Sequence, residues 1–515
     1  MKSMSVSEMS RRHPLLADRT AGVLLHPTSL PAIDGAVGIG DLGPTARQFT
    51  EWVAAAGLQR WQVLPIGPVG DGDSPYSALS SFAIEPMLVS IADLAEDGYL
   101  PDSAVQCSGE DEKADNRGRA GWRRARKWKR PRLESAFKTF CTRRGTLGIR
   151  GRNYVDFEVR QAGWLRAWCR YAAGQAQTMR ACAECERDPN YHAFLQFILD
   201  RQWGRLRRHA SERGVHLIGD IPIFCAPDSA DVESRPELFR LDRAGRPTML
   251  TGVPPPSEPD EEMSKVWGAT AVEEGQLWGH PHYKWAAHRK EGWAWWQDRV
   301  RTTLERFDLA RIDHFVGFHN LYEIPRNATD LRAGHWRRTP GAELLASLTG
   351  VIGPLPFIAE DLGDRVEPVN RLRDQFGIIG MRSLQLAFFG TPSADAELPH
   401  NHPRECVVYP GGHDNDTVVG WYRSIKAQTR RRFIDYAGPS AASDPAGAMI
   451  RLAFTSPAGT AIVQMQDLLR LGKGARMNHP GDPKGNWCWR MRRDDTTSKL
   501  AKSIKTLAAS SERVV

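Results

Sequence analysis

Eight short apolar runs recur along this chain, and each ends in a small cluster of polar residues. Continuous runs rich in Val, Ile and Leu are typical of parallel strands that are buried on both faces. The stretches between them leave room for helices, as in "PTARQFTEWVAAAGL" (44–58). Eight such units predict an α/β fold, a (β/α)8 TIM barrel. The runs lie within residues 21–30, 60–68, 214–224, 307–315, 356–363, 381–389, 406–416 and 459–469.

A doubly wound open sheet is the alternative arrangement of such units. It usually carries a glycine-rich phosphate turn between its first strand and its first helix. Here the first run is followed by "HPTSLPAIDGAVGIGDLG" (26–43), whose glycines lack the required spacing before a helix. The sequence therefore favours the barrel.

The spacing between the predicted strands is uneven. The second and third are separated by residues 69–213, far more than one crossover helix needs. Apolar and aromatic residues recur at helical spacing in 190–210, so we expect a mostly helical insertion there. A second insertion at about 225–300, rich in Pro and Trp, is expected to form a lid-like loop over the barrel mouth. The remaining predicted boundaries are an N-terminal tail (1–20), the barrel itself (21–492) and a C-terminal tail (493–515).

The composition is that of a folded cytoplasmic protein. The chain has 515 residues, of which 41% are hydrophobic and 25% are charged, so it can bury a large core. Its first twenty residues lack the apolar core of a signal peptide, and no window is apolar enough to span a membrane. Eight cysteines are too sparse for a disulfide framework, which suits a reducing compartment.

Cys182 and Cys185 form a CxxC pair, which raises the question of a structural zinc site. Such a site needs a second pair or His partners at matching spacing, and none is apparent. We therefore expect two ordinary thiols and no metal.

A net charge of +8 and the segment "RGRAGWRRARKWKRPR" (117–132) raise the question of nucleic-acid binding. No nucleic-acid-binding motif accompanies this segment. The alternative is a solvated helix whose Trp122 and Trp128 pack inward. We favour that alternative over a nucleic-acid partner.

Polar residues at the ends of the predicted strands indicate the site. In "FDLARIDHFVGF" (307–318), Arg311 and Asp313 stand two apart and so point to the same face of a strand. Asp220, Glu360 and Asp414 lie at or just beyond the ends of three other predicted strands. In a barrel these ends line the active site, so we expect the four carboxylates to converge on one pocket.

Gathered carboxylates can bind a metal, or they can act as acid, base and nucleophile on a glycosidic bond. The positive charge of Arg311 or His413 would repel a metal cation. Arg311 is better suited to keeping a carboxylate ionised, and His413 to donating a hydrogen bond to a sugar hydroxyl. Aromatic rings that stack on sugars are abundant, with 17 Trp and 10 Tyr. Those that lie in Gly- and Pro-containing loops are Trp278, Trp487 and Trp489.

From about residue 20 to 492 the sequence resembles the amylomaltases, the bacterial 4-α-glucanotransferases of glycoside hydrolase family 77. Several motifs in the same order carry this resemblance over nearly the full chain. They are "DSPYS" (73–77), "GDIPIFCAPDSADV" (219–232), "GQLWGHPHYKW" (275–285), "RIDHF" (311–315), "AEDLG" (359–363), "HDNDT" (413–417) and "ARMNHPGDPKGNWCWR" (475–490).

The resemblance implies a role for each matching residue. Asp313 matches the nucleophile, Glu360 the general acid/base, and Asp414 the third carboxylate, which holds sugar hydroxyls and stabilises the transition state. A retaining mechanism then predicts that the carboxyl groups of Asp313 and Glu360 stand roughly 5–5.5 Å apart. The resemblance also implies substrate-binding roles for Ser74, Tyr76, Asp220, Gln276, Trp278, Arg311, His314, His413 and Asn478.

The implied activity is transfer of α-1,4-glucan segments between maltooligosaccharides with release of glucose; glycogen and starch are larger candidate substrates. No cofactor is implied, because acid, base and nucleophile all come from the protein. An α-glucan hydrolase of the same clan is one alternative, distinguished by the absence of products longer than the substrate. A non-catalytic glucan-binding protein is another, although it would not need all three carboxylates. Preferred chain length and oligomeric state stay open.

The sequence departs from the family's pattern at three positions. Pro256 stands where the family has Asp in a Gly-x-Pro-Pro-Asp motif, and the connection from there to "GQLWG" (275–279) is longer. Val316 replaces an Arg, and His280 replaces an Asn. These changes affect substrate contacts and the covering loop, whereas the three catalytic carboxylates are retained.

Overall fold

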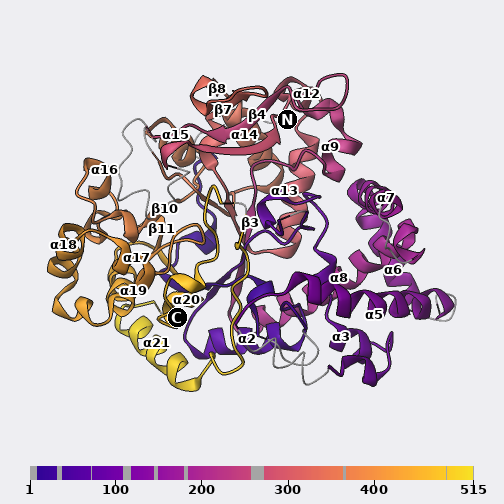
Figure 1. Cartoon of the computed structure of the whole chain (residues 1–515), viewed down its shortest axis with the longest axis horizontal. Helices are drawn as coiled ribbons and strands as arrows, with labels where there is room; N and C mark the ends of the chain where they lie inside the picture. Colours follow the sequence, from indigo (N-terminus) through magenta and orange to yellow (C-terminus); the bar gives the residue numbers. More distant parts are fainter. Residues whose placement is uncertain are drawn as a thin grey trace.

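A barrel of eight parallel strands lies at the centre of the computed structural model (Figure 1). The structure describes residues 9–31, 37–70, 72–107, 118–143, 149–178, 184–256, 272–363, 367–482 and 484–513. The strand order is β10-β11-β12-β1-β2-β3-β6-β9, and every pair in it is parallel. The strands are β1 (Thr20–Leu24), β2 (Arg60–Gln62), β3 (His216–Ile221), β6 (Leu309–Ile312), β9 (Phe357–Ala359), β10 (Gly380–Ser383), β11 (Cys406–Tyr409) and β12 (Thr460–Gln464).

The prediction of a (β/α)8 barrel is confirmed, because each predicted run overlaps one of these strands. The two ends of the sheet also meet. Ile358 in β9 forms a parallel bridge with Ile379, and the Ala359 N–H donates to the Ile379 carbonyl at 2.8 Å. Closure leaves the eight described strands of the barrel without a long free edge.

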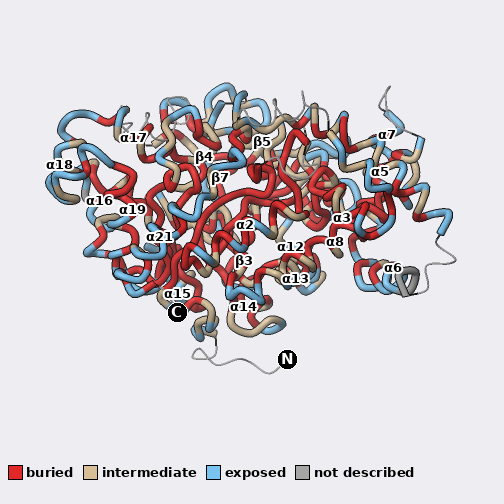
Figure 2. Tube along the Cα trace, turned by 90° about the horizontal axis from the view of Figure 1, so that it is seen from below, coloured by how far each residue is buried: buried red, intermediate tan, exposed pale blue. Residues whose placement is uncertain are grey.

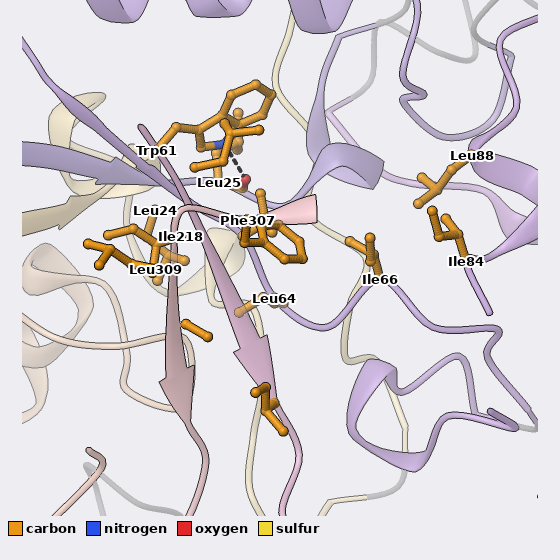
Figure 3. Packing of buried hydrophobic residues seen from close by; sticks show 14 of the residues in the cluster. Leu24, Leu25, Trp61, Leu64, Ile66, Ile84, Leu88, Ile218, Phe307 and Leu309 are labelled. Carbon is orange, nitrogen blue, oxygen red and sulfur yellow. Dashed lines mark hydrogen bonds between the residues drawn. The ribbon is translucent and has the colours of Figure 1, made fainter. Parts of the chain in front are cut away.

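Apolar side chains from neighbouring strands fill the core of the molecule (Figure 3). Trp61 is fully buried, and its indole N–H donates to the Leu25 carbonyl at 2.8 Å, so its polar atom is satisfied. Gly219 is required by packing, since a Cβ there would lie 2.5 Å from the ring of Phe307. Each fully buried Leu, Ile or Phe of such a core contributes roughly 1.5–3 kcal/mol to folding.

Helices surround the barrel (Figure 1). Several of these helices begin with a capping residue that the sequence shows. At the start of α8, for example, the Asp188 side chain is the N-cap and Pro189 is the first helical residue. Those belonging to the barrel and its loops are α2 (Pro44–Ala55), α8 (Pro189–Ser211), α9 (Ala230–Ser234), α12 (Trp285–Lys290), α13 (Ala294–Arg306), α14 (Gly341–Ile352), α15 (Glu367–Gln375), α16 (Pro392–Asp395), α17 (Val418–Ser424), α18 (Ala427–Ala437), α19 (Pro445–Thr455) and α20 (Met465–Leu468).

The described part of residues 69–213 is built largely from helices, which lie on one side of the barrel (Figure 1). In α5 both Trp122 and Trp128 are buried, and the buried Lys129 ammonium donates to Asp41 at 2.9 Å. The aromatic residues of this basic helix therefore pack inward. Besides α8, the helices are α3 (Ile91–Glu96), α5 (Trp122–Arg143), α6 (Ile149–Arg160) and α7 (Ala162–Thr178).

A four-stranded antiparallel sheet, ordered β5-β4-β7-β8, occupies part of the region expected to be a lid-like loop. Two of its strands come from residues 225–300 and two follow β6. Figure 2 shows β4 and β5 on the side of the molecule opposite the termini. Residues 257–271, where the longer connection falls, lie outside the described residues. The strands are β4 (Met249–Val253), β5 (Gln276–Pro281), β7 (Asn320–Pro325) and β8 (His335–Arg338).

The segment expected to be a C-terminal tail contains a further helix, α21 (Ser498–Ser510). Thr497 caps it, and its buried side chains are Ala501, Ile504 and Ala508. It packs against α2. Within the described residues, no helix is both long enough and apolar enough to cross a membrane.

Candidate active site

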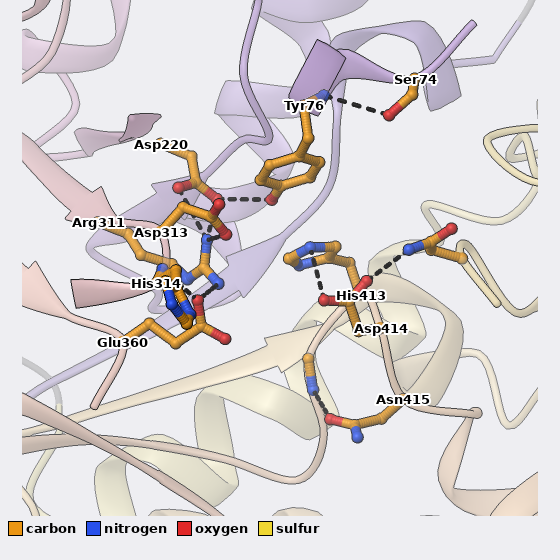
Figure 4. A network of polar contacts seen from close by, with 12 residues as sticks. Ser74, Tyr76, Asp220, Arg311, Asp313, His314, Glu360, His413, Asp414 and Asn415 are labelled. Carbon is orange, nitrogen blue, oxygen red and sulfur yellow. Dashed lines mark hydrogen bonds and ion pairs between the residues drawn. The ribbon is translucent and has the colours of Figure 1, made fainter. Parts of the chain in front are cut away.

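The buried guanidinium of Arg311 joins three carboxylates at the ends of three neighbouring strands (Figure 4). Its Nη1 lies 2.7 Å from Asp220 and 3.2 Å from Asp313, and its Nη2 lies 2.8 Å from Glu360. The Arg311 side chain is 3% exposed, whereas those of Asp313 and Glu360 are each 23% exposed. The Arg311 guanidinium is therefore buried beneath the site, whereas the Asp313 and Glu360 carboxylates are partly exposed to solvent.

Backbone hydrogen bonds hold these carboxylates in register. The Asp313 N–H donates to the carbonyl of Ile221, at the end of β3, and the Glu360 N–H donates to the carbonyl of Ile312, at the end of β6. Asp313 and Glu360 each follow the last residue of their strand. Their side chains therefore project from the same end of the sheet, as the barrel prediction required.

Asp414 reaches the site from the loop after β11. His413 Nε2 lies 3.4 Å from one of its carboxylate oxygens, and Asn478 Nδ2 donates to the other at 2.6 Å. The Asn415 side chain accepts from the Gly412 N–H at 2.8 Å and so ties the loop to itself. Asp414 is therefore held by neighbours from both its own loop and the 475–490 segment.

Tyr76 connects the two groups of carboxylates. Its hydroxyl donates to Asp220 at 2.7 Å, and its ring stacks on His413 with centroids 5.0 Å apart and planes 7° from parallel. Trp487 lies 5.8 Å from the Tyr76 ring. Ser74 caps the turn that carries Tyr76 and accepts from its N–H.

Trp278 contacts the site through His314. Its indole N–H donates to Gln276 at 3.0 Å, and its ring lies edge-on to His314 at 4.9 Å. The His314 N–H in turn donates to Glu360 at 2.7 Å. This backbone contact requires the left-handed conformation of His314 (φ 46°), which is strained for a residue with a side chain. Every predicted site residue thus lies in one contact network around Arg311 and Asp414.

Burial raises the pKa of Asp313 well above its usual range, and the charges of Glu360 and Asp220 add to the effect. Burial also acts to raise the pKa of Glu360, but the Arg311 guanidinium and the His314 N–H outweigh it, and this pKa is lowered. Burial lowers the pKa of His314 to about 4, so its imidazole is neutral. The pKa values of Asp313 and Glu360 are therefore shifted in opposite directions, that of Asp313 upward and that of Glu360 downward.

These directions are the reverse of the ones that a nucleophilic Asp313 and an acidic Glu360 need. Glu360 has two strong donors, whereas Asp313 has one longer contact with Arg311, which it shares with Asp220. Both donors to Glu360 reach its Oε2, so its Oε1 is free to carry a proton.

No group of three or more His, Cys, Asp or Glu side chains within the described residues is arranged to hold a metal ion. The Arg311 guanidinium occupies the space between the carboxylates that a cation would take. Of the CxxC pair, Cys182 lies outside the described residues and Cys185 is a free thiol.

Two of the unusual residues lie close to the site. His280 is buried, and its Nε2 lies 3.3 Å from the Ser77 hydroxyl, next to Tyr76. Burial lowers the pKa of His280 to about 4. Val316 packs against the core in the turn that follows His314. Pro256 is the last described residue before the gap at 257–271.

Arg476 is a site residue that the sequence reasoning missed. Its Nη2 donates to the Asp414 carbonyl at 2.6 Å, and its Nε donates to the Asn478 carbonyl at 2.7 Å. It is buried. It therefore fixes the backbone of two residues whose side chains bind each other. Only its place inside the motif at 475–490 distinguished it in the sequence.

Replacing Arg476 by Lys should lower kcat about 100-fold, because an ammonium cannot span both carbonyls and Asp414 shifts by a fraction of an ångström. KM for maltotriose should change much less. Steady-state kinetics with urea unfolding will check this, with Lys473→Gln at an exposed position nearby as the control. A lower urea midpoint, with a kcat that is unchanged once the rate is corrected for the fraction of folded protein, would show that Arg476 only supports the fold.

The chain matches the family model described as 4-alpha-glucanotransferase over residues 25–496. A 4-alpha-glucanotransferase of Thermus thermophilus is 37% identical, and the match covers 96% of this chain and 99% of that protein. One of Aquifex aeolicus is also 37% identical, with 93% and 97% covered. Among solved structures, an amylomaltase from Streptococcus agalactiae in complex with acarbose has a TM-score of 0.85 at 30% identity, covering 96% of this chain and 100% of that one. The chain belongs to glycoside hydrolase family 77, the 4-α-glucanotransferases.

Proposed function

We propose that this chain transfers α-1,4-glucan segments between maltooligosaccharides by a retaining double displacement on Asp313. The observation that carries the proposal is the contact of Asp313 and Glu360 with the two terminal nitrogens of one guanidinium. Such sharing supports the short carboxyl separation of a retaining enzyme, roughly 5–5.5 Å, over the roughly 6.5–9.5 Å of an inverting one. The proposal is also supported by the structurally similar amylomaltase from Streptococcus agalactiae, which was solved in complex with acarbose.

In the first half-reaction an Asp313 carboxylate oxygen attacks the anomeric carbon of the donor. The glycosidic C–O bond breaks, and Glu360 gives its proton to the leaving oxygen. In the second half-reaction Glu360 takes the proton of an acceptor hydroxyl, whose oxygen displaces Asp313. Asp414, held by His413 and Asn478, is placed to bind hydroxyls of the sugar in transit. The positive charge that develops on the sugar in the transition state thus lies beside the Asp313 and Asp414 carboxylates.

Maltooligosaccharides are the proposed substrates, with glycogen and starch as larger ones, and glucose is the proposed by-product. The cytoplasm is the proposed location. Seven cysteines are free thiols in the described part of the chain, which suits a reducing compartment. Plant relatives of this family are described as chloroplastic or amyloplastic.

Incubation with maltotriose alone tests the proposal. We expect glucose together with a ladder of longer maltooligosaccharides, because the glycosyl-enzyme is captured by a sugar acceptor. Chromatography of the products over time will distinguish the outcomes. Glucose and maltose alone would make the chain a hydrolase, and unchanged maltotriose would make it a binding protein for glucans.

Replacing Glu360 by Gln should slow transfer from maltotriose by about 10²–10⁴-fold, since the leaving oxygen then has no acid. A donor with a good leaving group, such as α-maltosyl fluoride, should lose much less in its first half-reaction, because fluoride leaves without a proton. Burst kinetics with both donors will measure this, with Glu405→Gln at an exposed position as the control. An equal loss with both donors would remove Glu360 from the acid role.

A further inference from the structure

The turn of residues 73–77, called the Tyr76 turn below, forms only local backbone hydrogen bonds among the described residues. The Tyr76 N–H, for example, donates to the Ser74 hydroxyl at 3.3 Å. Apart from the Tyr76 hydroxyl, two described side-chain hydrogen bonds join this turn to distant parts of the chain, one at each end. They come from Arg126 in the helical insertion and His280 in the antiparallel sheet.

Arg126 reaches the first residue of the Tyr76 turn. It lies on α5, and its Nη2 donates to the Asp73 carboxylate at 2.8 Å. Asp73 has the left-handed conformation (φ 55°), which a residue with a side chain adopts at a cost. The two side chains are 34% and 31% exposed. An ion pair at this exposure adds little to overall stability, so we expect its main effect on the geometry of the turn.

His280 reaches the last residue of the Tyr76 turn. Its backbone N–H donates to the Thr251 hydroxyl at 3.1 Å, which fixes the end of β5 to β4. Its Nε2 lies 3.3 Å from the Ser77 hydroxyl. Burial lowers the pKa of His280 to about 4, so a neutral imidazole faces that hydroxyl at pH 7. The turn is therefore joined at this end to a strand that is itself held in place.

Tyr76 links the turn to both groups of carboxylates in the site (Figure 4). Its hydroxyl donates to Asp220 at 2.7 Å, and Asp220 shares one guanidinium nitrogen with Asp313. Its ring stacks on His413, whose Nε2 lies 3.4 Å from Asp414. A shift of the turn would therefore move the neighbours of the nucleophile and of the third carboxylate together.

We propose that Arg126 and His280 are positioning residues for glucan transfer, which hold the Tyr76 turn at its two ends. Each acts through Tyr76 and not on the sugar itself. A displacement of about 1 Å in a group that orients reacting atoms can lower a rate about 10²-fold, so contacts that add little to stability can still matter for the rate. The inference rests on the proposed function.

Replacing Arg126 by Gln should lower kcat/KM for maltotriose about fivefold, because Asp73 loses its ion-pair partner. The urea midpoint should change little. The matched control is Arg123→Gln, at an exposed position one turn earlier on α5, and it should leave both quantities unchanged.

Replacing His280 by Leu should lower kcat/KM about tenfold, because Leu fills the space but cannot bond to Ser77. His280→Gln should retain most of the rate, since its amide can reach the same hydroxyl. His282→Leu is the matched control for a buried histidine of this segment, because the His282 ring lies against the Leu250 carbonyl at 3.1 Å and not against the turn.

The same substitutions made in Tyr76→Ala protein separate positioning from a general structural role. There the turn has no Tyr76 side chain to position, so Arg126→Gln and His280→Leu should cause no further loss. Fluoride release from α-maltosyl fluoride keeps these slow rates measurable. Urea unfolding will verify that each variant is folded, and Arg126→Gln decides the test alone if His280→Leu is not.

Three results would overturn the proposal: unchanged rates in Arg126→Gln and His280→Leu, equal losses in the Leu and Gln variants of His280, or losses that persist in full in the Tyr76→Ala background. Transfer by the unaltered protein tests the proposed function separately, because the proposal can fail while that protein still lengthens maltotriose.

Discussion

Replacing Asp313 by Asn should lower the rate of transfer from maltotriose by at least about 10⁴-fold, because an amide oxygen cannot form the covalent glycosyl-enzyme. Binding of maltooligosaccharides should be largely retained, since the side chain keeps its size and Arg311, Tyr76 and Trp278 are unaltered. Product analysis over several days and calorimetric titration will measure the two quantities.

The same variant carries a second expectation, for stability. The pKa of Asp313 is raised in the folded protein, so ionising it at neutral pH disfavours the native state. This unfavourable contribution is present above the unfolded pKa and is absent at lower pH, where the carboxyl is protonated in both states. Asn removes it, so near pH 7 the urea midpoint should be equal to or higher than that of the unaltered protein.

Asp435→Asn, at an exposed position on α18, is the control for both measurements. It should leave rate, binding and urea midpoint unchanged. Substantial residual transfer by the Asp313 variant would remove Asp313 from the nucleophile role. A large fall in its stability would show that ionised Asp313 is part of what holds Arg311 in place.

The barrel strands could be predicted because each is buried on both faces and therefore reads as a continuous apolar run. The antiparallel sheet gave no such signal. All four residues of β8 are exposed, and β5 contains Gly279 and Pro281. Helix α21 was missed for a similar reason, because its exposed face is rich in Lys and few of its residues are buried.

The barrel architecture alone predicted that the carboxylates lie close together, because parallel strands end at one edge of the sheet. It did not predict which carboxylate has a raised pKa and which a lowered one. The sequence predicted that Arg311 keeps a neighbouring carboxylate ionised, but which one depends on the His314 N–H, and that donor reaches Glu360 only through a left-handed turn. Residues held on loops, such as Tyr76 and Asn478, were identified by resemblance. Spacing alone does not place loops.

Arg513 carries the second large expectation, because it is fully buried and no carboxylate in the described residues pairs with it. Its guanidinium instead donates to six backbone carbonyls, which belong to the end of α19, the turn before β12 and the start of β1. They are those of Phe454, Thr20, Gly459, Ala453, Ser456 and Ala458. Burial lowers its pKa to about 9, so it remains charged at neutral pH. The last carbonyls of a helix lack internal partners and favour a cation, so Arg513 satisfies α19 and ties it to the first strand.

Replacing Arg513 by Met should lower the free energy of unfolding by about 3 kcal/mol or more, because the apolar side chain fills the space but removes a charged donor from six buried carbonyls. Arg19 and the Thr20 N–H still donate to those of Phe454, Ala458 and Gly459, so the loss falls mainly on the other three. Urea unfolding at pH 7 will measure this as a lower midpoint with a similar slope. Lys505→Met, at an exposed position of α21, is the matched control and should have little effect. The transfer rate below the transition should also change little, since Arg513 contacts Thr20 at the start of β1, at the opposite end of that strand from the mouth of the barrel. An unchanged midpoint would mean that water satisfies these carbonyls as well as Arg513 does, and that the segment after α21 contributes nothing to holding α19 against β1.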